Sequence, residues 1–205
     1  MCESASWLTN SYSLSLSLSR YTQPLYNSDI LRLGERIKYI TIISFAEGLL
    51  YMLDSIRKTH TDEAGAVDLL LRAISKFEEV LNSNSNNIVT LRECANACLS
   101  LDKMMANHQQ WNASGKQSAN MQRAGEYLTR ALNLEPDNPQ TLCMQALFSQ
   151  RSGKIADAEN YFLTALELSP TYTDALLQYS LFLRFVGESK LAQRFRHFYL
   201  VFQKA

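Results

Sequence analysis

The sequence predicts an all-α fold with an internal repeat, and three observations lead to that prediction. The 205 residues include only 7 Gly and 4 Pro, roughly half of average usage, which disfavours a turn-rich β sandwich. From Asp29 onward, apolar residues recur every three or four positions, as on one face of a helix. In the second half of the chain, matching residues also return at a spacing of 34 positions.

Polar clusters interrupt the periodic segments and set the expected helix boundaries. The clusters are THTDE at 59–63, NSNSNN at 82–87, NHQQWNASGKQSAN at 107–120, PDNP at 136–139 and SPTYTD at 169–174. The segments between them predict helices near residues 30–58, 63–82, 88–106, 119–134, 139–151, 155–168, 173–185 and 188–204.

Residues 1–28 differ from the rest, because Glu3 and Arg20 are their only charged residues. Ser and Leu alternate between Ser13 and Ser19 with the period of a strand, yet no second strand-like segment is available to pair with them. We therefore expect a Ser-rich tail at 1–28, disordered or docked, before a helical repeat domain at 29–205. A strand added to a partner's sheet, a phosphorylation cluster and a weak targeting peptide remain open for this tail.

The 34-residue spacing indicates an array of similar structural units. Its matches are Ala124, Ala158 and Ala192; Ala131 and Ala165; Leu132, Leu166 and Leu200; Pro136 and Pro170; Gly153 and Gly187; and Leu142 and Leu176.

Residues 139–172 contain a complete unit. A large residue, a small one, a glycine between helices, an aromatic flanked by alanines and a closing proline follow in order as Leu142, Ala146, Gly153, Ala158, Phe162, Ala165 and Pro170. This pattern resembles the tetratricopeptide repeat (TPR), clearly over about residues 119–205 and partly over 73–106. The resemblance implies a right-handed α-α superhelix, a TPR-like solenoid of antiparallel helix pairs. Its repeat-like units would be about 30–87, 88–138 with an insertion, 139–172 and 173–205, and Arg196 stands where the last unit would have a large apolar residue.

The resemblance also implies a concave groove lined by the first helix of each pair. The residues that we select as the candidate peptide-binding groove are Arg92, Asn96, Cys143, Leu147, Gln150, Leu177, Leu181 and Arg184. An apolar floor with polar edges suits an amphipathic helix or an extended apolar peptide. The alternative is that the protein's own N-terminal segment covers these leucines.

One ligand class is disfavoured by the same positions. Arg92 and Asn96 resemble the first pair of the carboxylate clamp with which some TPR proteins hold a chaperone's C-terminal tail. The remaining clamp positions carry Met144, Asp174 and Gln178, and Asp174 would repel a carboxylate. We therefore do not expect a chaperone tail as partner.

Several other functions are not expected. The sequence contains no P-loop, Rossmann glycine fingerprint, HExxH or nucleophile elbow, which argues against an enzyme or a cofactor. Its 20 Lys and Arg balance 20 Asp and Glu, so nucleic acid is not expected. The longest apolar stretch, 39–53, is shorter than a membrane span and contains Glu47, so no transmembrane segment is expected.

The cysteines and the lack of a signal peptide predict a cytoplasmic protein with reduced thiols. Cys94 and Cys98 lie one helical turn apart, but no matching Cys or His pair completes a metal site. Ordinary packing is therefore the expected role of both thiols.

Two further features stand out. Trp111 lies in a polar loop, where it caps a helix pair or contacts a partner. From Arg184 to the C-terminus, basic and aromatic residues alternate with Glu188 as the only acid. That segment is either a docking surface for an acidic partner or anionic lipid, or an ordinary last helix with solvated cations.

Together these observations predict a non-catalytic protein-interaction scaffold or adaptor that binds an unidentified partner peptide or helix. The alternative is a regulatory or assembly module of a larger signalling or enzyme chain, which would pack in cis.

Overall fold

The computed structural model describes residues 33–108 and 118–203, and within these ranges it contains eight helices and no strand. They are α2 (Leu33–Lys58), α3 (Glu63–Ser83), α4 (Ile88–His108), α5 (Ala119–Leu134), α6 (Pro139–Arg151), α7 (Ile155–Leu168), α8 (Thr173–Val186) and α9 (Ser189–Phe202). The expected boundaries agree with these to within three residues. The predicted tail at 1–28 and Trp111 lie outside the described residues.

The chain divides into two compact units, Met1–Thr41 and Ile42–Ala205. The second unit contains α3 to α9 and the part of α2 that follows Thr41. The predicted boundary after residue 28 falls in a part of the chain that the structure does not describe, so it stays a prediction.

Local signals explain where several helices begin and end. Asp62, Ser118 and Asn138 cap α3, α5 and α6, because each side chain accepts a hydrogen bond from a backbone N–H of the first turn. Gly153 after α6 and Gly187 after α8 have φ values of 75° and 100°, which favour glycine. These two glycines are 34 residues apart, so the repeat is also visible in the backbone.

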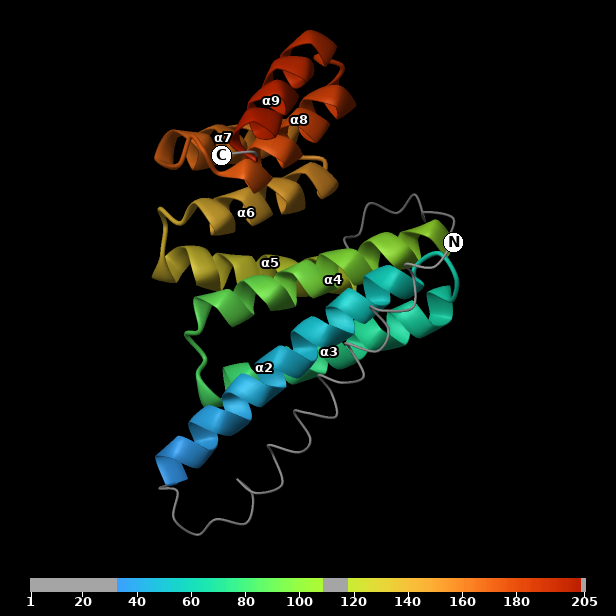
Figure 1. Ribbon diagram of the computed structural model, residues 1–205, viewed down its shortest axis with the longest axis vertical. Coiled ribbons are helices and arrows are strands. Elements are labelled where there is room, and N and C mark those ends of the chain that lie inside the picture. The colour runs from blue at the N-terminus through green and yellow to red at the C-terminus, as the bar shows by residue number, and fades with distance from the viewer. Residues whose placement is uncertain (1–32, 109–117, 204–205) are drawn as a thin grey trace. The chain divides into compact units, whose positions relative to one another are not determined.

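Consecutive helices pack as antiparallel pairs: α4 on α5, α6 on α7, and α8 on α9 (Figure 1). Alanines with no exposed surface lie where the helices meet, among them Ala95, Ala124, Ala146 and Ala158. Small side chains permit a close approach of the two backbones. The predicted all-α, TPR-like solenoid of antiparallel helix pairs is therefore confirmed.

Two hydrophobic clusters form the core. The first involves α2 to α5 and includes Phe77, and the second involves α6 to α9 and includes Phe162 and Tyr179. Helix α6 joins the clusters, because its Phe148 packs against the first and its Ala146 belongs to the second.

A polar bridge connects the second helices of successive pairs, α3 and α5. The Glu78 carboxylate accepts hydrogen bonds from Arg123 and from the Tyr127 hydroxyl, the latter at 2.6 Å. Arg130 donates to the carbonyl oxygen of Ser85 at 2.7 Å. Burial, together with the bond to Glu78, raises the pKa of Tyr127, so its hydroxyl remains a neutral donor.

One face of α2 packs on α3. The rings of Phe45 and Phe77 are 5.6 Å apart, and Glu47 forms a 3.2 Å ion pair with Lys76. Among the described helices, one contains a segment, Lys38–Lys58, long and apolar enough to cross a membrane by length and composition alone. The sequence predicts no transmembrane segment, because the apolar stretch 39–53 is too short. The structure differs because α2 continues to Lys58, which makes the segment long enough. Only 22% of the most apolar window is buried.

Candidate peptide-binding groove

The predicted groove residues lie on the first helices of three successive pairs. Arg92 and Asn96 belong to α4; Cys143, Leu147 and Gln150 to α6; and Leu177, Leu181 and Arg184 to α8. Their surroundings differ from one helix to the next.

Arg92 joins α4 to the start of α6. Its Nη1 donates a hydrogen bond to Oδ1 of Asn138 at 3.2 Å. The same oxygen caps α6 by accepting from the backbone N–H groups of Gln140 and Thr141. Arg92 is therefore already oriented by an internal partner, although part of its surface remains accessible.

Tyr172, which precedes α8, is influenced by residues from all three helices. Its hydroxyl donates to Oδ2 of Asp174 at 3.4 Å. Burial is the main cause that raises the pKa of Tyr172; Cys143 and Asp174 add to the effect, while the charge of Arg92 opposes it. One residue from each first helix, Arg92, Cys143 and Asp174, therefore acts on the Tyr172 hydroxyl. Sequence reasoning did not select Tyr172, because it lies outside the helical positions that define the groove.

Cys143 lies in the protein interior. It is 4% exposed and belongs to the second core cluster. Burial, with a smaller effect from Asp174, raises the pKa of its thiol to about 12. The thiol is thus a neutral packing group at physiological pH, and little of its surface is available to a ligand.

Among the predicted groove residues, the most accessible apolar side chain lies on α8. Leu147 and Leu177 are half-buried, whereas Leu181 is 45% exposed. Phe185, which was not selected, is 67% exposed. It follows Leu181 by four residues and so shares its helix face, and this helical spacing is the signal that would have found it. Gln150 is half-buried and Arg184 is exposed beside this apolar surface.

Glu93 on α4 is a second residue that sequence reasoning missed. Burial raises its pKa, and a hydrogen bond from Asn96 and the charge of Arg92 oppose that shift. The Asn96 side chain, predicted to face a ligand, therefore interacts with a neighbour on its own helix. Glu93 carries no sequence signal, because it falls outside the helix positions from which groove residues were chosen.

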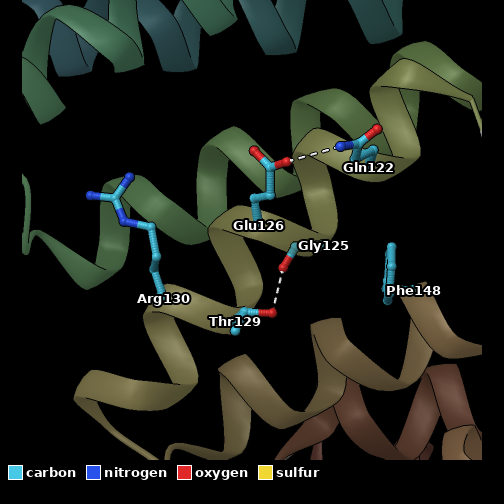
Figure 2. Close-up of a pocket in the computed structure, with 6 residues that line it drawn as sticks. All are labelled: Gln122, Gly125, Glu126, Thr129, Arg130 and Phe148. Carbon is cyan, nitrogen blue, oxygen red and sulfur yellow. Dashed lines mark hydrogen bonds between the residues drawn. The ribbon is translucent and has the colours of Figure 1, made fainter.

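The structure also contains a hollow of about 520 Å³ between α5 and α6. Figure 2 shows Gln122, Gly125, Glu126, Thr129 and Arg130 along α5, with the Phe148 ring of α6 across from them. Two of the polar side chains bond within α5: Thr129 to the carbonyl of Gly125 at 2.8 Å, and Gln122 to Glu126 at 3.3 Å. None of the predicted groove residues lines this hollow.

In the described part of the chain, no group of three or more His, Cys, Asp or Glu side chains is arranged to hold a metal ion. Cys94 and Cys98 are buried free thiols. Burial raises the pKa of Cys98 to about 11, opposed by Arg123, so the nucleophilic thiolate is not favoured at neutral pH.

The helix pairs and the 34-residue register define a TPR-like helical repeat fold. No family model and no curated protein matches the sequence. Among solved structures, MamA is similar at 12% identity, over 85% of this chain and 96% of that chain, with a TM-score of 0.49. The first TPR of Spaghetti (RPAP3), bound to the HSP90 peptide SRMEEVD, is similar at 14% identity, over 70% and 95%, with a TM-score of 0.44.

Proposed function

We propose that this protein is a non-catalytic interaction scaffold that binds a partner's amphipathic helix or extended apolar peptide along α6 and α8. The observation that carries this proposal is the apolar surface of Leu147, Leu177, Leu181 and Phe185. Leu147 and Leu177 are half-buried, Leu181 is 45% exposed and Phe185 is 67% exposed. An apolar surface of this kind, bordered by polar side chains, is typical of a protein-binding site.

The borders of the surface suggest the character of the ligand. Arg184 and Gln150 are accessible, and both can bond to a peptide backbone or to acidic side chains. Arg92 donates a hydrogen bond to Asn138, and Asp174 accepts one from Tyr172, whose pKa Arg92 also influences. A free C-terminal carboxylate would meet an arginine that is already hydrogen-bonded and, on α8, the acidic Asp174, so an internal apolar segment of a partner is the better ligand.

We also propose a cytoplasmic location. Cys94, Cys98 and Cys143 are free and buried, and reduced thiols are the usual state in that compartment. Packing in cis against another part of a larger chain would use the same apolar surface and remains the alternative use of the groove.

The proposal is tested by comparing three proteins as bait: the wild type, a Leu147→Glu, Leu181→Glu variant, and a Leu163→Glu, Leu168→Glu control on α7. The control leucines are 39% and 46% exposed, so the control makes the same chemical change on another helix. Captured proteins are quantified by mass spectrometry, and peptides from them are titrated by fluorescence anisotropy.

We expect a set of partners captured by the wild type and the control but lost with the groove variant. Their peptides should bind at least about tenfold more weakly to Leu181→Glu, because a charge would then face apolar ligand atoms. The single variant Leu181→Glu controls for misfolding of the double variant. Leu181 is exposed, whereas Leu147 packs on the core, so the single change leaves the core intact. Identical partners and affinities for all variants would rule the groove out.

A further inference from the structure

The last helix pair can be compared directly with the pair before it. Helix α7 runs from Ile155 to Leu168 and α9 from Ser189 to Phe202, so both bounds are offset by 34 residues. Residues related by this offset occupy equivalent positions in the two pairs. The role of a position in α7 therefore indicates what the same position in α9 is placed to do.

In the earlier pair, one face of α7 receives the following helix, α8. Phe162 at its centre has no exposed surface. Its ring centroid lies 5.6 Å from that of Tyr179 and 5.5 Å from that of Phe182, both on α8. A buried aromatic thus holds the next helix in place.

The equivalent face of α9 is open in the part of the chain that the structure describes. Ala192, equivalent to Ala158, is buried against α8 in the same way. Arg196, equivalent to Phe162, is exposed. Leu200, equivalent to the half-buried Leu166, is 47% exposed. The backbone of α9 therefore repeats the arrangement with which α7 receives α8, but the central side chain of this face is Arg196 instead of a phenylalanine.

The exposed charged side chains of α9 have one sign. Lys190, Arg194 and Arg196 are all exposed, and no acidic residue lies within Ser189–Phe202. None of these three cations forms an ion pair with a described residue, whereas Arg57, Lys76 and Arg123 do. Arg196, at the centre of the open face, is therefore available to an acidic group of a partner.

We propose that the exposed face of α9, with Arg196 at its centre, docks an acidic amphipathic helix of a partner protein. The partner helix would occupy the place that α8 takes on α7, with a carboxylate where α8 presents Phe182. The carboxylate would pair with the Arg196 guanidinium. Apolar residues of the partner would cover Leu200. This surface is distinct from the groove on α6 and α8.

The geometry favours a helix over an anionic membrane surface. Arg194 and Arg196 are two residues apart on a helix that turns about 100° per residue, so they lie on nearly opposite sides. A flat bilayer meets one side of α9 at a time. A helix packed against α9, in contrast, would contact only the open face that carries Arg196 and Leu200.

The test uses the full chain and a fluorescein-labelled probe with the α8 sequence, residues 173–186, carrying Phe182→Glu. A matched peptide with Phe182→Lys is the probe control. Binding is measured by anisotropy against the wild type, Arg196→Glu, Arg196→Gln and Lys103→Glu, the last being the same charge reversal at an exposed lysine of α4.

We expect the Phe182→Glu peptide to bind the wild type and Lys103→Glu equally, and Arg196→Glu at least tenfold more weakly. Arg196→Gln should give an intermediate affinity, and the Lys peptide should bind the wild type at least tenfold more weakly than the Glu peptide. An Arg196→Phe variant should reverse the preference, so that the unmodified α8 peptide binds more tightly than its Glu form.

Three results would overturn the proposal. The first is equal binding of the Glu and Lys peptides, or no loss with Arg196→Glu while circular dichroism confirms a folded variant. The second is salt-sensitive binding to phosphatidylserine vesicles that requires Arg196, without binding of the Glu peptide. The third is self-association of the wild type that Arg196→Glu abolishes, which would assign this face to a second copy of the chain.

Discussion

Two glycines in helix interiors, Gly48 on α2 and Gly125 on α5, test how tightly the repeats are packed. Replacing glycine by alanine inside a helix normally stabilises it by about 1 kcal/mol. A β-carbon at position 48 would lie 2.5 Å from Cε1 of Phe77, and one at position 125 would lie 2.9 Å from Cζ of Phe148. At both positions a steric clash therefore opposes the stabilisation expected from alanine, and the clash is more severe at position 48.

The cost at Gly48 is the larger of the two. Normal carbon–carbon contact is about 3.5 Å, so the Phe77 ring would have to withdraw by about 1 Å. That ring has no exposed surface and packs against Phe45. Overpacking of this kind costs about 1–3 kcal/mol, so we expect Gly48→Ala to lower the free energy of unfolding by about 1 kcal/mol. Gly125→Ala should leave it unchanged or raise it, because Phe148 is half-buried beside a hollow.

The assay is urea denaturation followed by far-UV circular dichroism. For a chain of this size, the loss at Gly48 corresponds to a decrease in Tm of roughly 2–4 °C. A Gly48→Ala, Phe77→Leu double variant should be more stable than the two single effects predict, by about 1 kcal/mol, because the smaller side chain makes room for the methyl group. If Gly48→Ala is as stabilising as Gly125→Ala, the steric reasoning is wrong.

Two further predictions concern the core and the buried ionisable groups. Phe162→Ala should lower the free energy of unfolding by about 3–5 kcal/mol, whereas Arg196→Ala at the equivalent exposed position should change it by less than about 0.5 kcal/mol; equal losses in urea would contradict the comparison. Burial raises the pKa of Cys98 from 9.0 to about 11, and burial with the nearby Glu159 raises that of Tyr179 from 10.0 to about 12. The folded state therefore retains these protons more firmly than the unfolded state, and the stability that they contribute is present below pH 9 and decreases as the pH rises beyond it. The prediction is wrong if the urea midpoint increases between pH 9 and 11. It is also wrong if the midpoint decreases by the same amount in the Cys98→Ser variant as in the wild type.

Most of the fold could be predicted because its signals are local or strictly periodic. Asn138 followed by Pro139 marks the start of α6, and Gly187 marks the end of α8. The resemblance of residues 139–172 to a tetratricopeptide repeat placed Phe162 at a position of a large packing residue, and Phe162 has no exposed surface. Each of these inferences needs only the sequence within one helix pair.

The candidate site was less predictable, because helical periodicity tells which face is apolar but not what covers it. Leu147 and Leu181 hold equivalent positions by the 34-residue offset, yet the first is half-buried and the second is 45% exposed. The difference arises because α8 packs over α6, whereas the face of α8 bearing Leu181 remains accessible. No pattern within one helix contains that information.

The sequence by itself determined the helices, their pairing and the residues that pack within each pair, because these depend on contacts between segments close along the chain. Only the tertiary structure decided the partners across pairs. Arg92 bonds to Asn138, and Glu78 accepts from Arg123 and Tyr127, over separations of 45 to 49 residues. Which side chains meet at such distances depends on how one helix pair is set against the next. That orientation follows from the packing of many side chains together, and it also leaves Arg196 exposed where its counterpart Phe162 is buried.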